Sequence, residues 1–124
     1  MIHHVSIGTN DAARARRFYD AVLPILGLRA MPGGDGLDYG TGQTEFSIEE
    51  PADGQPATVG NGVHIAFAAE DRATVDRFYA AALRNGGSGA GEPGLRPDYD
   101  ANYYAAFVRD PDGNKIQAVT FSAQ

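Results

Sequence analysis

Two stretches of the chain, residues 3–23 and 63–83, repeat one pattern of apolar and polar positions. Each begins with apolar residues at every second position, which is typical of a half-buried strand. Each continues with apolar residues three and four positions apart, which predicts an amphipathic helix. The two stretches align without a gap and match at identical residues, among them His4/His64 and Phe18/Phe78. The chain is therefore expected to contain the same strand and helix twice.

The ends of both helices are marked by residues with capping chemistry. Asp11 and Asp71 precede the apolar helical positions, where a carboxylate can accept hydrogen bonds from the first free amides. The first helix is predicted to end near Pro24 or Gly27. The second is predicted to end at residues 85–87, Asn-Gly-Gly, where glycine can adopt the left-handed conformation that closes a helix.

Further strands are expected after each helix, separated by turn-forming residues. In the first half they are LRAM, GLDYG and TEFSIEE, divided by turns at residues 32–34 and 40–42. In the second half they are YYAAFVRD and NKIQAVTF, joined by the turn DPDGN. Residues 86–102 are too rich in glycine and proline for the composition to predict regular structure beyond one short strand, and a loop of this length is expected to border a site. The result is an α+β protein of two tandem βαβββ modules, about 1–59 and 60–124, within a single domain spanning 1–124.

Composition removes several classes of function. The 124 residues include 16 acidic and 10 basic side chains, a net charge of -6, which disfavours nucleic-acid binding. The chain has no cysteine, so nitrogen and oxygen atoms must hold any metal. No apolar run is long enough to cross a membrane and the first residues lack a basic leader, so a cytoplasmic protein without membrane partners is expected. GAGEPG at 89–94 follows a helix and opens none, so no nucleotide cofactor is expected.

The paired motifs HHVSIGTND…RRFYDAVLPILGL and VHIAFAAED…RFYAAAL, with the ending YYAAFVRDPDGNKIQAV, carry a family resemblance over nearly the whole chain. The sequence resembles the vicinal oxygen chelate superfamily, which includes glyoxalase I, bleomycin resistance proteins and extradiol dioxygenases. The resemblance implies two modules that form a cup-shaped sheet with the helices outside. It also implies a homodimer, because members commonly pair their modules within or between chains.

Strand alternation places His4 and His64 on matched positions facing the expected cup. Two imidazoles at equivalent points suit a divalent metal with positions open for substrate. In the superfamily the other ligands usually come from the last strand of each module, most often as glutamate. The sequence has Gln117 at that place in the second module.

In the first module the strand TEFSIEE offers Glu45, Ser47 and Glu49 on one face, and matching its Ile-Glu pair with Ile-Gln of the second module selects Glu49. The expected metal ligands are therefore His4, Glu49, His64 and Gln117, for Zn, Ni, Mn or Fe(II). The alternative is that the histidines are hydrogen-bonded structural residues and that Glu49 lies at a solvated strand end.

Arginine and tyrosine residues gather in and after the long loop, and they are the expected substrate contacts: Arg96, Tyr99, Tyr103 and Tyr104. Alternatively, Tyr103 or Tyr104 packs in the core. Two functions follow from the resemblance. One is a metal-dependent enzyme of the glyoxalase lyase or isomerase, or dioxygenase, type that acts on a small substrate chelating the metal. The other is a metal-free protein that sequesters a small molecule, as bleomycin resistance proteins do, for which the acidic surface favours a cationic ligand.

Overall fold

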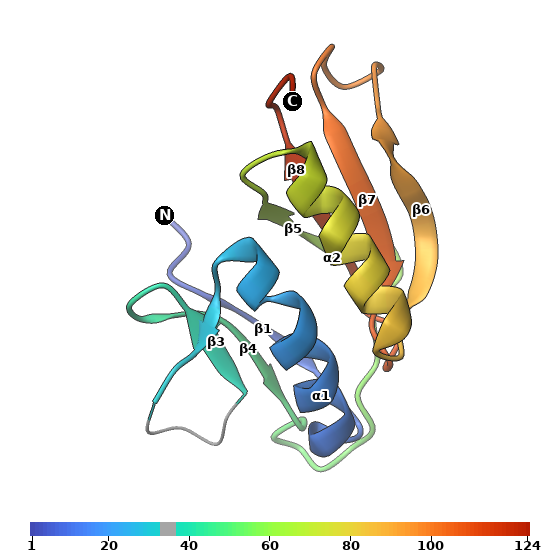
Figure 1. Cartoon of the computed structure of the whole chain (residues 1–124). Coiled ribbons are helices and arrows are strands. Elements are labelled where there is room, and N and C mark those ends of the chain that lie inside the picture. Colours follow the sequence, from blue (N-terminus) through green and yellow to red (C-terminus); the bar gives the residue numbers. More distant parts are fainter. Residues whose placement is uncertain (33–36) are drawn as a thin grey trace.

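The structure, a computed structural model, describes residues 1–32 and 37–124 (Figure 1). Most of the turn expected at residues 32–34, and Gly36 of the strand GLDYG, lie outside the described residues. The first module contains β1 (Val5–Gly8), α1 (Ala12–Val22), a 3-10 turn (Pro24–Leu26), β2 (Arg29–Ala30), β3 (Asp38–Gly40) and β4 (Thr44–Glu49). The second contains β5 (His64–Ala68), α2 (Arg72–Arg84), β6 (Ser88–Leu95), β7 (Tyr104–Arg109) and β8 (Lys115–Thr120).

Both helices begin directly after the predicted capping residues, Asp11 and Asp71. The Asp11 carboxylate accepts a hydrogen bond from the Arg14 amide at 3.0 Å, and the Asp71 carboxylate accepts one from the Thr74 amide at 2.8 Å. These bonds satisfy amides that have no partner within the helix. The hydroxyl of Thr74, followed by its amide, donates to the Asp71 carboxylate and holds the pKa of Asp71 below its usual value. The second helix ends at Arg84, and Gly86 follows with a φ of 99°. The predicted positions of the two helices are therefore confirmed.

Each module forms a four-stranded mixed sheet with the same strand order. The orders are β1-β4-β3-β2 and β5-β8-β7-β6, and in each sheet the first and last strands of the module pair in parallel. The remaining neighbours pair antiparallel. One helix lies against each sheet, and α1 and α2 lie next to each other (Figure 1). The predicted α+β fold of two tandem βαβββ modules is confirmed, and its sheets do not close into a barrel.

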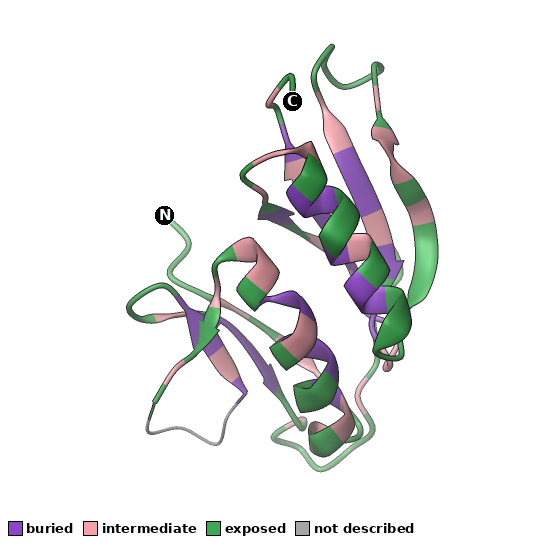
Figure 2. Ribbon diagram, viewed as in Figure 1, coloured by how far each residue is buried: buried purple, intermediate pink, exposed green. Residues whose placement is uncertain are grey.

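The two modules share one hydrophobic core beneath the helices (Figure 2). Phe18 of α1 and Phe78 of α2 are fully buried, as their helical spacing predicts. The rings of Phe46 and Phe67 meet edge to face across the modules, with centroids 5.1 Å apart. Burial of each such ring contributes on the order of 1.5–3 kcal/mol. Because these residues face the helices, alternation leaves the opposite face of each sheet for polar side chains.

The turn DPDGN also joins the two modules. It closes as predicted, with the Gly113 amide bonded to the Asp110 carbonyl at 2.9 Å and Gly113 at a φ of 95°. In addition, Asp110 accepts a hydrogen bond from the buried Tyr19 hydroxyl at 2.6 Å, and the Asn114 amide donates to the Gly8 carbonyl at 3.0 Å. Asp112 forms a salt bridge with Arg14 at 2.9 Å. The turn is therefore a polar contact between modules as well as a hairpin connection.

The long glycine-rich segment is more regular than its composition predicts. Residues 88–95 form the eight-residue strand β6, which pairs with β7 through two register shifts. The expectation of a largely irregular segment with one short strand was therefore wrong for its first half. The irregular pairing shows why: glycine and proline are accommodated at the bulges of an edge strand. GAGEPG lies within this strand and begins no helix, as expected.

The Tyr19–Asp110 hydrogen bond predicts a dependence of stability on alkaline pH. Burial, followed by the neighbouring Asp110 carboxylate, raises the pKa of Tyr19 well above 10.0. The stabilisation is therefore complete below the unfolded-state pKa, near 10, and is lost as the pH rises above it. Tyr19→Phe should lower the free energy of unfolding by about 1–3 kcal/mol at pH 7. It should also make the loss of stability above pH 10 less steep, as measured by urea unfolding monitored by circular dichroism.

Some alkaline dependence should remain in this variant, because burial and Asp20 also raise the pKa of Tyr39. Equal slopes above pH 10 for the wild type and Tyr19→Phe would contradict the assignment. One cooperative unfolding transition is expected for both proteins if the modules form a single domain.

Candidate functional site

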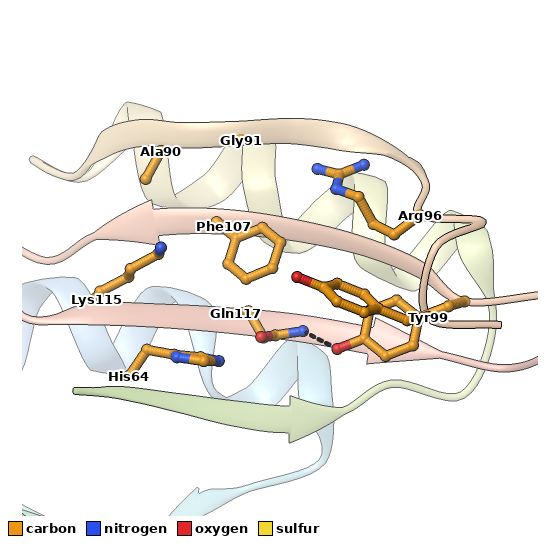
Figure 3. A pocket seen from close by; sticks show the side chains of 9 residues that line it. His64, Ala90, Gly91, Arg96, Tyr99, Phe107, Lys115 and Gln117 are labelled. Carbon is orange, nitrogen blue, oxygen red and sulfur yellow. Dashed lines mark hydrogen bonds between the residues drawn. The ribbon is translucent and has the colours of Figure 1, made fainter. Parts of the chain in front are cut away.

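An open pocket of about 630 Å³ lies on the face of the second sheet that points away from α2 (Figure 3). It is bordered by β5, β6, β7, β8 and the loop after β6. Its lining combines cationic, aromatic, amide and small side chains: His64, Ala90, Gly91, Arg96, Tyr99, Tyr103, Phe107, Lys115 and Gln117.

Strand pairing explains why these side chains share one face. In β8, Lys115 and Gln117 are two residues apart and both point into the pocket, whereas Ile116 between them is buried in the core. His64 is the register partner of Lys115 in the parallel strand β5. Phe107 is the partner of Gln117 in the antiparallel strand β7. The hydrogen-bonded register of three neighbouring strands therefore fixes the centre of the pocket.

The ring of Phe107 is the common neighbour of three nitrogen-bearing side chains. The Arg96 guanidinium carbon lies 5.5 Å from the ring centroid and the Lys115 ammonium lies 5.1 Å from it. The centroid of the His64 ring lies 6.0 Å from the same point. Both cations therefore make cation–π contacts with a single ring, which holds them over the pocket.

Gln117 is a second fixed point. Its side chain is only 1% exposed, and its amide nitrogen donates a hydrogen bond to the Tyr103 hydroxyl at 2.9 Å, drawn as the dashed line in Figure 3. Tyr103 also packs edge to face on Tyr99, with ring centroids 5.0 Å apart. Because the Tyr103 oxygen accepts this bond, its own hydrogen stays available to donate to a ligand.

The charge of the pocket is opposite to that of the whole chain. The protein carries a net charge of -6, yet the described residues that line the pocket include Arg96 and Lys115 and no carboxylate. The expectation that overall acidity favours a cationic ligand is not supported at this site, because nearby charges dominate the field felt by a bound molecule.

Three of the four predicted substrate contacts, Arg96, Tyr99 and Tyr103, line this pocket. Tyr104 does not: it lies on the helix side of the sheet, where its hydroxyl donates a hydrogen bond to Asp76 of α2 at 2.7 Å. That bond is the main cause of a raised pKa for Tyr104. Adjacent residues of a strand point to opposite faces, so Tyr103 and Tyr104 could not both face the pocket.

The four predicted metal ligands are divided between different parts of the chain. His64 and Gln117 line the pocket, whereas Glu49 borders a different depression beside Ser6 and Gly8. His4 is exposed just before β1, with its Nδ1 atom 2.9 Å from that of His3. Across residues 1–32 and 37–124, no three His, Cys, Asp or Glu side chains gather as a metal site. Whether the four residues bind metal stays a prediction.

The strand registers also show which residue of the first module lies at the position equivalent to Gln117 of the second, and it is not Glu49. Ser6 and Ala66 are matched positions of the repeat, and their parallel partners are Ser47 and Gln117. Ser47 is therefore the counterpart of Gln117, and the Ser6 and Ser47 hydroxyl oxygens lie 2.7 Å apart. Glu49 pairs with Gly8 and corresponds to Val119. Matching Ile-Glu with Ile-Gln was shifted by two residues, because short motifs do not fix the register of strands separated by loops of different length.

Two central pocket residues, Phe107 and Lys115, were not among the predicted site residues. The signal for Lys115 was present, because it precedes the recognised Gln117 by two residues in one strand and so shares its face. Phe107 could be assigned only once the pairing of β7 with β8 was known. An apolar ring in an apolar strand otherwise indicates core.

The fold and the repeated modules define the class of protein, and comparisons agree. The family model described as the Glyoxalase/Bleomycin resistance protein/Dioxygenase superfamily matches residues 1–118. The chain belongs to this superfamily, as the sequence resemblance implied.

Solved structures support the assignment. A glyoxalase/bleomycin resistance protein from Albidiferax ferrireducens T118 is 42% identical with a TM-score of 0.81, over 95% of this chain and 96% of that chain. A family enzyme from Burkholderia phytofirmans PsJN is 18% identical with a TM-score of 0.75, over 98% of both chains. Lactoylglutathione lyase from Agrobacterium tumefaciens is 20% identical with a TM-score of 0.64, over 97% of this chain and 92% of that chain. The last two likenesses concern the fold alone.

A search of curated protein sequences gives no significant match. Among the described residues, neither helix has the length and apolar character required to traverse a bilayer.

Proposed function

We propose that this protein is a small-molecule-binding member of the superfamily whose pocket works without a resident divalent metal. The observation that carries the proposal is the strand register. It assigns neutral side chains, Ser47 and Gln117, to the matched positions on the last strand of each module. A hydroxyl and an amide can each offer an oxygen to a metal, but neither neutralises its charge.

The surroundings of His64 support the same conclusion. Its register partner Lys115 contributes a cationic side chain to the same pocket and packs on the same ring, Phe107. A positive charge beside an imidazole opposes the binding of a second, divalent cation. The donor set is therefore a poor fit for Zn, Ni, Mn or Fe(II), and binding in the pocket is assigned to the side chains themselves.

A metal-dependent enzyme remains the second candidate, and the matched histidines His4 and His64 favour it. In that case, assembly with a second copy must bring the first sheet, with His4 and Glu49, against a second sheet, with His64 and Gln117. Lyase and dioxygenase chemistry would then be the expected forms. The relatives with those names are less than 25% identical to this chain, so they support the fold rather than the reaction.

Metal content separates the two candidates. The protein purified without chelator should contain much less than one divalent metal ion per chain by inductively coupled plasma mass spectrometry. His4→Ala/His64→Ala should contain the same small amount, because neither imidazole is holding a stoichiometric ion. About one metal per chain in the wild type, lost in the double variant, would contradict the proposal and support the enzyme.

The superfamily resemblance also leads us to propose a homodimer. In such a dimer, the polar face of the first sheet of one copy would cover the pocket on the second sheet of its partner. Size-exclusion chromatography with light scattering should give twice the mass of one chain at micromolar concentration. A monomer at that concentration would contradict the dimer, and the binding site would then consist only of the pocket on the second sheet of a single chain.

A further inference from the structure

The pocket holds two positive charges that no described carboxylate balances. The guanidinium of Arg96 donates to the carbonyl oxygens of Gly94 at 2.9 Å and Glu92 at 2.8 Å, which fix its position without carrying a full negative charge. The ammonium of Lys115 packs on Phe107. Within the described part of the chain the salt bridge found is Arg14–Asp112, in which neither Arg96 nor Lys115 takes part. Both charges are therefore available to a ligand.

The arrangement around Arg96 is built into the backbone. A side chain at Gly91 would place its Cβ atom 3.0 Å from Phe107 Cδ2 and 3.3 Å from Arg96 Nη2. Glycine at this point of β6 leaves the space in which the ring and the guanidinium meet. The cation over the aromatic ring is thus a packed feature of the pocket, whereas a freely moving surface arginine would need no such space.

The remaining lining indicates the body of the ligand. Tyr99, Tyr103 and Phe107 supply three aromatic rings, and Ala90 and Gly91 take up little room beside them. Flat apolar groups stack favourably on such rings. The free hydroxyl hydrogen of Tyr103 offers one donor for an oxygen of the ligand.

From these contacts we propose that the pocket binds a small aromatic monoanion, with its carboxylate between Arg96 and Lys115 and its ring against Phe107 and the tyrosines. This inference rests on the proposed function, because it assigns recognition of the anion to side chains rather than to a metal. A cationic ligand would meet two like charges in this pocket. A polyphosphate would leave most of its charge unmatched by two cations and would gain little from three rings.

A matched pair of probes tests the charge directly. 2-Naphthoate and 2-naphthamide have the same ring system, and only the first is an anion at pH 7. Titration of the ¹⁵N-labelled full chain in the presence of EDTA, followed by amide chemical shifts, should show 2-naphthoate shifting pocket residues. We expect it to bind at least about tenfold more tightly than 2-naphthamide, the difference typical of a charge-assisted hydrogen bond.

Lys115→Met keeps the length of the side chain and its contact with Phe107 while it removes the charge. It should weaken 2-naphthoate binding about tenfold and leave 2-naphthamide binding within about twofold. Arg84→Gln is the matched control, because it removes one positive charge from an exposed position at the end of α2. It should leave both affinities within about twofold. The wild-type comparison of the two probes needs no variant and so stands even if Lys115→Met folds poorly.

Failure of this inference is distinguishable from failure of the proposed function. If 2-naphthoate binds no better than 2-naphthamide, or if neither shifts the pocket residues, the anion assignment is overturned whatever the metal content. If preference for the anion exists only without EDTA and is unchanged in Lys115→Met, a metal recognises the anion and both proposals fail. A preference for 2-naphthoate over 2-naphthamide that persists in EDTA and is lost in Lys115→Met supports the anion site.

Discussion

Parallel pairing between the first and last strands of each module is the constraint on which the site depends. Pairing β5 with β8 in register fixes His64 beside Lys115, and antiparallel pairing of β7 adds Phe107 beside Gln117. A shift by one residue would send each of these side chains to the helix side and bring core residues to the pocket. The buried aromatic contacts between modules make such a shift costly. The same packing that stabilises the fold therefore selects the chemistry of the pocket.

The pocket and the rest of the molecule have different electrostatic roles. The whole chain carries a net charge of -6, whereas two cations within 6 Å of one ring centroid create a local positive site. Acidic side chains serve elsewhere: Asp110 and Asp112 connect the modules, and Asp11 and Asp71 cap the helices. Net charge consequently says little about which ligand this pocket prefers.

Much of the fold could be predicted from the sequence, because its determinants are local. Asp11, Asp71 and Gly86 mark helix ends by their own chemistry, and the repeat reveals two modules without any knowledge of contacts. The site was predicted less completely, because it depends on pairing between strands far apart in the chain. Alternation gave the faces of β5 and β8 correctly, but only the register showed that Ser47, rather than Glu49, matches Gln117. Alternation allows only one of Tyr103 and Tyr104 to face the pocket, and the structure was needed to show that it is Tyr103.

We propose that neutral side chains at Ser47 and Gln117 leave the matched histidines without the charge a divalent metal requires. Restoring carboxylates tests it most directly, by calorimetric titration of Zn²⁺ into metal-free wild type and Ser47→Glu/Gln117→Glu. If this proposal is right, the wild type should bind Zn²⁺ weakly and the double variant should bind it at least about tenfold more tightly, since each carboxylate adds an anionic ligand. Tight, stoichiometric binding by the wild type that the two glutamates do not improve would contradict it.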